Sequence, residues 1–483
     1  MKTERNLFLI FSIPLYCLLL FLSFRGVLFR GAPADMAQSI YLHEYDFTLQ
    51  WVYVGAALAL SVAWLACLRW FDGIAGDDRA VFGVGAVLGL LSVAAYPGVN
   101  SNDILAYVGY GRIMAVHSSN PWMNSYGNFS DDYAPFAWYP HPMPYGPMVA
   151  PFLAAAGALS TISIPLSFYF LKLCWLGVHL YSGWLVLGIA RALGRPGRWA
   201  AWAFLTCPLL QIELLNNGHC DGLMVMFELL SVRALVTRDD DDGARQALLW
   251  GLLAVLVKPT AVLLLAAEAA WMVRQRRWIP LLGAMVVACA VFGVLLQTLF
   301  QSETARSALT NPHLLTNAHS FHSIFFHARH DTYLRVYEED RYRAMRVAIA
   351  GLFALFCLWR LLLVRTRADV IREYLWVTLA LMVFYSARVW PWYVAWLLPF
   401  AVVVEYGPLR RMVLVYSVSM FAIYAFSFAY NWRSLPWHIV RVLMSSGIAL
   451  AWLVADATWG SEEAPDSDSD SPESFAPAPG LGV

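Results

Sequence analysis

The sequence predicts an all-helical membrane protein that crosses the bilayer many times. Of its 483 residues, 60% are hydrophobic and only 14% are charged, and the mean hydropathy is +0.56. Soluble domains carry about 25% charged residues, so this composition excludes an ordinary soluble protein. The apolar residues also gather into long runs, and a helix needs roughly 17 to 25 such residues to cross the hydrocarbon core.

Apolar runs of this kind lie at 7–28, 50–68, 80–98, 165–190, 199–215, 221–237, 279–299, 346–364, 373–389, 392–405, 412–430 and 438–455. Three shorter stretches remain, at 146–160, 246–257 and 261–273. We therefore expect a bundle of about 12 to 14 transmembrane helices, some of them short or re-entrant. The first run has no small-residue cleavage site, which favours a retained helix over a cleaved signal peptide.

Positive charge predicts the topology. If Lys2 and Arg5 hold the N-terminus in the cytoplasm, the positive-inside rule places the arginine-rich turns there as well. All of these turns can be cytoplasmic together on two conditions: 246–273 must enter and leave on the same side, and 146–190 must cross only once in net. At ~1.5 Å per residue, each half of 246–273 reaches about 18 Å of the ~30 Å core. We expect two short helices broken at Pro259, and a re-entrant or surface helix at 146–160.

We expect a single integral domain over 1–460 in the plasma (inner) membrane, with both termini cytoplasmic. Its first outer loop, 99–147, is too long for a plain helix connector, so we expect a folded cap with surface helices. Outer loop 300–345 is predicted as a second cap. Residues 461–483 are rich in Ser, Asp, Pro and Glu and are expected to form a disordered acidic tail.

Composition also excludes some functions. Lys plus Arg and Asp plus Glu number 33 each, so no excess of positive charge points to nucleic acid. The seven cysteines are scattered through apolar runs without ligand spacing, which favours small buried hydrophobes over disulfides or a metal site. No D-x-D motif calls for a metal, and we expect no cofactor.

Asp103 begins the first outer loop, directly after an apolar run. It is either a helix-capping or solvated aspartate or a general base that takes a proton from an attacking hydroxyl. His219 and Asp221 form a polar turn, NNGHCD, between two predicted spans. The alternatives are a metal site, for which no third ligand stands at a diagnostic spacing, and an ordinary turn with satisfied polar side chains, which is favoured.

Lys258 lies between the apolar stretches LLAVLV and AVLLLAA. It either extends its ammonium to the headgroups or binds an anion such as phosphate. Trp390, Trp392 and Tyr393 are typical of an interfacial aromatic belt, yet such rings also pack on sugars. Arg388 beside them offers a second phosphate donor, and His319 and His322 are a weaker cluster in the second cap.

These motifs together resemble a known family. SNDILAY with GR, NPW and YGP, then CPLLQIELLNNGHCDGLMV, VLVKPTAVLLL and VWPWYVAWLLPF, are similar, in order, to motifs of type C glycosyltransferases. They resemble in particular the actinobacterial polyprenyl-phosphate-mannose-dependent α-1,6-mannosyltransferases. The resemblance covers about residues 95 to 405. Cys220 stands where the family usually has Asn, and Leu105 where Tyr is common.

The resemblance implies an enzyme that moves a hexose, most simply mannose, from a polyprenyl-phosphate sugar to the hydroxyl of a glycan or glycolipid acceptor. The transfer would take place on the outer membrane face. It implies Asp103 as the base, with inversion by direct displacement. It also implies that Lys258, Arg388, His219 and Asp221 hold the donor phosphate or orient the substrate. The aligned motifs add Tyr107, Arg112 and Tyr145 to this binding set.

Two other classes fit parts of the sequence. A transporter or flippase of lipid-linked glycans would account for an intramembrane lysine and broken helices, but it predicts polar residues along a path through both faces. A non-catalytic membrane scaffold leaves the polar clusters unexplained. The predicted clusters gather at the outer ends of the helices, which favours the enzyme.

Overall fold

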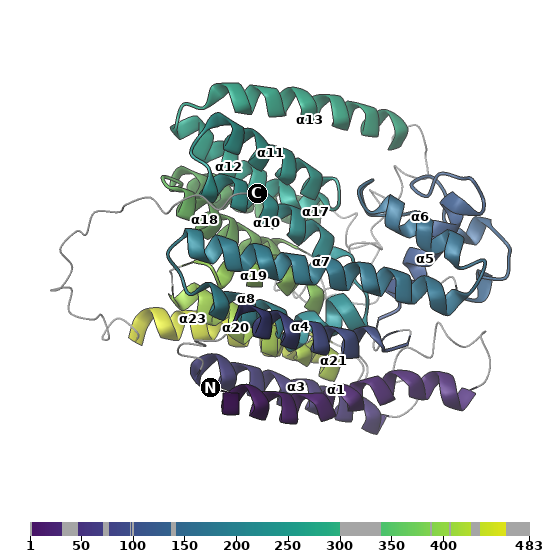
Figure 1. The fold of residues 1–483 in the computed structure, drawn as a ribbon. Coiled ribbons are helices and arrows are strands. Elements are labelled where there is room, and N and C mark those ends of the chain that lie inside the picture. The colour runs from purple at the N-terminus through teal and green to yellow at the C-terminus, as the bar shows by residue number, and fades with distance from the viewer. Residues whose placement is uncertain are drawn as a thin grey trace.

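The computed structural model describes residues 2–30, 47–70, 77–96, 98, 101–136, 142–299, 340–386, 389–404, 407–426 and 435–459. These residues form helices, turns and loops, and none of them forms a strand. The predicted all-helical fold is therefore confirmed. The helices pack into one bundle, and α5 (Asp103–Ala115) and α6 (Ala150–Leu159) form a lobe at one end of it (Figure 1).

Within the described residues, four segments are long and apolar enough to cross a membrane. They are Asn6–Phe24, Thr48–Arg69, Ile164–Ala192 and Ile439–Asp456. The first three belong to α1 (Lys2–Arg30), α3 (Phe47–Trp70) and α7 (Ile164–Ala192). The fourth runs through α22 (Leu435–Val442), the π-turn η10 (Leu443–Gly447) and α23 (Ile448–Trp459). The chain is thus an integral membrane protein.

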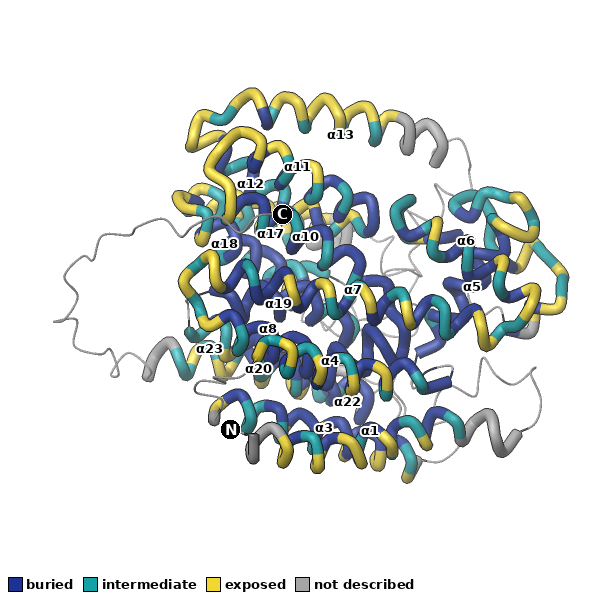
Figure 2. Tube along the Cα trace, viewed as in Figure 1, coloured by how far each residue is buried: buried dark blue, intermediate teal, exposed yellow. Residues whose placement is uncertain are grey.

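Shorter apolar helices complete the outside of the bundle. α13 (Trp278–Leu299) and α17 (Asp340–Leu362) carry apolar stretches of this kind. Most described side chains of α13 are exposed (Figure 2), including Ile279 at 70% and Val286 at 69%. In water such a surface would be unfavourable, so it is suited to contact with lipid tails.

The centre of the bundle is built around α7. This helix contacts α4 (Asp78–Val93), α6, α8 (Gly197–Leu205) and α10 (Asp221–Thr237). Large side chains fill the space between the helices, and Trp64, Trp202 and Tyr374 are buried. Further helices are α18 (Arg367–Ala380) with the π-turn η8 (Leu381–Tyr385), α20 (Gly407–Ser419) and α21 (Phe421–Phe426).

Prolines interrupt three of the apolar stretches. α11 (Asp241–Val255) ends before Lys258, a short turn follows over Pro259–Ala261, and α12 begins at Val262 and ends at Arg274, as predicted. The run at 199–215 is also broken, because Pro208 starts a new turn, α9 (Pro208–Leu210), followed by the π-turn η5 (Gln211–Asn216).

The prediction of a continuous span at 392–405 is wrong. This stretch forms a 3₁₀ turn, η9 (Pro391–Trp396), and a single α-helical turn, α19 (Leu398–Ala401). Proline lacks the backbone N–H that a helix interior needs, and Pro391 and Pro399 each start a new short turn here. The apolar run is therefore buried among other helices and does not cross as a helix of its own.

The lobe at the end of the bundle contains most of the first predicted cap. α5 and α6 cross at two glycines: a Cβ atom on Gly111 would lie 1.8 Å from the carbonyl oxygen of Leu153, and one on Gly157 would lie 2.1 Å from the carbonyl carbon of Gly111. Between these helices lie the short turns η3 (Tyr126–Asn128) and η4 (Ala134–Phe136). Residues 300–339 of the second predicted cap and the tail 461–483 lie outside the described residues.

Candidate functional site

Two glycines from distant parts of the chain make close contacts near the start of α5. Gly98 packs on the end of η5, and an added Cβ there would lie 3.0 Å from the carbonyl oxygen of Asn216. Gly218 has a φ of +78° and faces Ile104, whose Cδ1 would lie 2.9 Å from an added Cβ. Glycine is needed at position 218 for both backbone conformation and space. These close contacts bring Asp103 next to His219.

Asp103, His219 and Glu213 form a line of charged groups. The Asp103 Oδ2 atom lies 3.3 Å from Nδ1 of His219, and the Glu213 Oε2 atom lies 3.4 Å from Nε2. His219 and Glu213 are fully buried, whereas the Asp103 side chain is 29% exposed. Burial disfavours the charged imidazole, but the two carboxylates outweigh it and raise the pKa of His219, a residue of the turn between helices, to about 9.

Asp221 and Lys258 form a second pair beside the first. The Lys258 ammonium donates to Oδ1 of Asp221 over 2.8 Å, and Nε1 of Trp396 donates to the same oxygen over 2.8 Å. Lys258 occupies the predicted break, where its backbone is extended at φ −151° and ψ 128°. Its side chain is 18% exposed and that of Asp221 is 1% exposed. The lysine is therefore the accessible member of the pair.

Aromatic rings surround both pairs. The His219 ring stacks on Trp392 at a centroid distance of 3.8 Å, and Trp390 stacks on Trp392 at 5.2 Å with an angle of 5° between the rings. The Lys258 ammonium lies 4.7 Å from the ring centroid of Tyr393 and 4.8 Å from that of Trp396. Trp392 is buried at 9% exposure and stands perpendicular to Tyr393, so its ring mainly holds His219 and Trp390 in place.

The end of the cap loop also packs beside Lys258. The hydroxyls of Tyr107 and Tyr145 lie 3.3 Å apart, and the Tyr145 ring centroid lies 6.0 Å from the Lys258 ammonium. The backbone N–H of Gly146 donates to the carbonyl of Val257 over 3.0 Å. The loop is thereby fastened to the segment that carries Lys258.

Arg112 belongs to a separate network inside the lobe. It is nine residues after Asp103 on α5, about 13 Å along the helix. Its guanidinium donates to Asp131 and Ser160 over 2.8 and 2.9 Å, and its side chain is 3% exposed. Burial opposes ionisation of Asp131, but hydrogen bonds from Tyr126 and Arg112 lower the pKa of this carboxyl to about 2. This placement supports a role in holding the cap together.

We expect the change Arg112→Met to destabilise the lobe by about 1.5–3 kcal/mol, because it removes a charged hydrogen bond to Asp131, although this carboxylate keeps its hydrogen bonds from Tyr126 and Tyr133. The measurement is thermal unfolding in detergent, with limited proteolysis of the cap. Arg79→Met is the matched control: Arg79 is 93% exposed, and its loss should change little. The Asp131 contribution should be complete above pH 3.8 and disappear as the pH falls through about 2. Equal effects of both changes would contradict this role.

The structure brings together most of the predicted site residues and adds two. Those gathered at the site are Asp103, Tyr107, Tyr145, His219, Asp221, Lys258, Trp390, Trp392 and Tyr393. Arg388, His319 and His322 lie outside the described residues. Glu213 and Trp396 were missed. The signal for Glu213 was a carboxylate within the apolar run at 199–215, because an ionisable group there calls for a function.

Metal ligands are not grouped in this region. Among the described residues, no three His, Cys, Asp or Glu side chains are placed to hold a metal ion. His219 and Asp221 lie in the same turn, yet each is paired with a different partner, Asp103 and Lys258. Lys258 thus neutralises Asp221, while His219 lies between the two carboxylates of Asp103 and Glu213.

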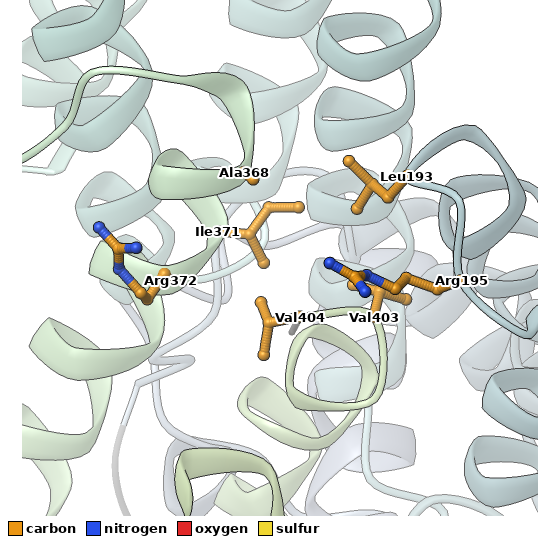
Figure 3. A pocket seen from close by; sticks show the side chains of 7 residues that line it. All are labelled: Leu193, Arg195, Ala368, Ile371, Arg372, Val403 and Val404. Carbon is orange, nitrogen blue, oxygen red and sulfur yellow. The ribbon is translucent and has the colours of Figure 1, made fainter. Parts of the chain in front are cut away.

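A cavity of about 230 Å³ lies elsewhere, where α7 ends and α18 begins. It is lined by Leu193, Ile371, Val403 and Val404 with Arg195 and Arg372. Arg195 reaches into it, whereas the guanidinium of Arg372 points away from its centre (Figure 3) and pairs with Asp369 and Glu373. No carboxylate or nucleophile lines this cavity, so the polar site at the other end of α7 is the candidate for chemistry.

Comparison with known proteins agrees with the motifs. The family model described as alpha-(1->6)-mannopyranosyltransferase, N-terminal domain, matches residues 24–275, more than half of the chain. No curated protein matches. The matched region contains both charged clusters of the site. These are Asp103 with His219 and Glu213, and Asp221 with Lys258.

Proposed function

The chain belongs to the alpha-(1->6)-mannopyranosyltransferase family, and from this premise we propose that it moves mannose from a polyprenyl-phosphate sugar to an acceptor hydroxyl by direct displacement. The family makes the protein a glycosyltransferase that uses a mannose donor and an acceptor. The lipid-phosphate donor, the base and the membrane face belong to the proposal. The observation that carries it is the placement of a partly exposed carboxylate, Asp103, beside an accessible cation, Lys258.

Asp103 is the proposed base. The other two carboxylates of the site are closed off, since Glu213 is 0% and Asp221 1% exposed. In the transfer, the acceptor oxygen forms a bond to C1 of mannose while the bond between C1 and the phosphate oxygen breaks. The electron pair of that bond leaves with the phosphate, and the hydroxyl proton passes to Asp103. Only one base is required, because a phosphate monoester is already a fair leaving group.

Lys258 is the proposed partner of the donor phosphate. A lysine serves phosphate as a compact charge, and here Asp221 and two rings hold the ammonium in place while part of it stays open. The partly exposed ring of Trp390, held by stacking on the buried Trp392, is suited to the sugar. Direct displacement inverts C1, so an alpha product requires a beta-linked mannosyl phosphate.

The outer membrane face is supported by the distribution of arginines. Asp221 is at the start of α10, and the arginines that pair with Asp239, namely Arg277 and Arg367, lie just beyond the end of that helix. Arg191 and Arg198 pair with Asp78 where α7 ends. By the positive-inside rule these ends are cytoplasmic, which leaves the site on the outer side.

We expect the purified protein in detergent to transfer labelled mannose from a polyprenyl-phosphate mannose to a short alpha-mannoside. Linkage analysis of the product should show an alpha-1,6 bond. Detergent removes the two leaflets between which a flippase works, so product formation separates the enzyme from the transporter alternative. A protein that turns over no donor here, yet moves labelled glycolipid between leaflets of vesicles, would overturn the proposal.

A further inference from the structure

Glu213 is a buried carboxylate that the proposed reaction does not use. It lies in the π-turn η5, and such turns are frequent at functional sites. Its Oε1 accepts a hydrogen bond from the Tyr424 hydroxyl over 2.7 Å, and its Oε2 accepts one from Nδ2 of Asn217 over 3.1 Å. The same Oε2 faces His219 at 3.4 Å. The carboxylate is thus fixed at both oxygens.

Other helices hold this arrangement in turn. Nε2 of Gln50 donates to the backbone carbonyl of Tyr424 over 2.7 Å, and the Tyr424 ring packs edge-on against Tyr53 at 5.9 Å. Gln50 and Tyr53 belong to α3, and Tyr424 to α21. Burying a carboxylate costs several kcal/mol unless it is paired, and the partner found here is the imidazole that faces Asp103.

We propose that Glu213 is a positioning residue that acts through His219 on Asp103. It holds His219 as an imidazolium whose Nδ1–H is directed to Oδ2 of Asp103, which leaves Oδ1 of Asp103 for the acceptor hydroxyl. This inference rests on the proposed function, because it assigns a role to Glu213 only if Asp103 is the base. Glu213 itself touches no substrate.

The groups around His219 fit this role. Asp103 faces it from α5, Glu213 from η5 and the uncharged ring of Trp392 from η9. The nearby pair Asp221–Lys258 is neutral as a whole. Two carboxylates and one imidazolium carry a net charge of −1, so the cluster stays suited to accept one proton. When Asp103 takes that proton, the net charge of the cluster becomes zero, with Glu213 and His219 still ionised.

The distances also fit a site that awaits its substrates. Separations of 3.3 and 3.4 Å suit ion pairs but exceed the ordinary hydrogen-bond lengths of about 2.7–3.0 Å. Catalytic hydrogen bonds are often long in proteins without substrate and shorten in the complex. Before the substrates bind, the Glu213 carboxylate keeps the His219 ring in one orientation. The aspartate of a Ser-His-Asp triad holds its histidine in the same way.

The test is the pH dependence of kcat/KM, which reports groups of the substrate-free protein, in the change Glu213→Gln. The glutamine keeps the shape and can still accept from Tyr424, but it removes one of the two charges that keep His219 protonated. In the unchanged protein the alkaline limb should follow the pKa of His219, near 9; in the variant it should move toward the ordinary histidine value of 6.5. We expect a shift of one pH unit or more and about tenfold lower kcat/KM between the limbs, with the loss in kcat and an unchanged donor KM.

Two further variants make the result decisive. Glu268→Gln is the matched control, because Glu268 is also a fully buried carboxylate, bound to Ser231 over 2.5 Å on other helices; its alkaline limb should not move. Tyr424→Phe removes only the hydroxyl that holds Glu213 and should shift the limb in the same direction by less. If Glu213→Gln fails to fold, the pH profile of Tyr424→Phe decides whether Glu213 acts through His219.

An alkaline limb that stays in place, or a kcat that falls equally at every pH, would overturn the role of Glu213 and leave the proposed function standing. Asp103→Asn separates the two cases. If that variant still transfers mannose, the proposed base is wrong, whatever Glu213→Gln does. If Asp103→Asn is inactive and the limb moves only in the Glu213 and Tyr424 variants, both proposals are supported.

Discussion

Replacing Asp103 by asparagine is expected to lower the rate of mannosyl transfer by about 10²- to 10⁴-fold, the usual contribution of a general base. The amide has the same shape as the carboxylate but cannot take the acceptor proton. The measurement is product formation from saturating polyprenyl-phosphate mannose in detergent. Because the acceptor and donor contacts remain, both KM values should change little, and the loss should appear in kcat.

The control for this change is Asp78→Asn. Asp78 is also an aspartate in the first turn of a helix, α4, but it pairs with Arg191 and Arg198 at the other end of the bundle. Surface ion pairs contribute little, so we expect near-normal transfer. Size-exclusion profiles and unfolding temperatures of both variants should match those of the unchanged protein. An Asp103→Asn protein that folds and transfers at the normal rate would exclude Asp103 as the base.

Replacing Lys258 by glutamine is expected to lower kcat/KM for the lipid-phosphate donor by about 10²- to 10³-fold, as loss of one preorganised group facing developing charge does. The leaving phosphate gains negative charge in the transition state, and the neutral amide cannot stabilise it. The amide can still donate to Asp221, so the buried carboxylate keeps a partner. The measurement is donor dependence of the initial rate at fixed acceptor.

Lys258→Arg is the matching control, since arginine keeps the charge and also binds phosphate. It should recover a large part of the lost rate, although the bulkier guanidinium must fit between Tyr393 and Trp396. The acceptor KM should be the same in all three proteins. If glutamine and arginine lower the rate alike while both proteins fold, the lysine serves the fold through Asp221 and does not bind the donor.

Much of the site could be predicted because its signals are local. Lys258 and Pro259 between two short apolar stretches predict a break between two helices, and the structure has this break. The turn with His219 and Asp221 between two apolar runs also stands as expected, and α10 has its predicted bounds, Asp221–Thr237. Each of these signals depends on a few neighbouring residues and on the length that a bilayer demands.

Hydropathy misled at one place, and the contacts of some residues could not be predicted, both for physical reasons. Hydropathy treats 392–405 as a span because it counts apolar residues and ignores that Pro391 and Pro399 prevent a continuous helix. Arg112 carries a motif resemblance, yet the structure surrounds it with Asp131 and Ser160 of the same lobe. Those partners are up to 48 positions away in the sequence, and spacing does not reveal them.

The sequence by itself determined the membrane setting, the helical class, the family and the separate motifs, because composition, run length and local order are properties of neighbouring residues. Only the tertiary structure decided which motifs meet. Asp103 and Glu213 are 110 positions apart, and Tyr424 lies another 211 beyond Glu213, yet all three belong to one network around His219. Contacts of this kind depend on how helices pack, and Gly98 and Gly218 permit the close approach that creates this one.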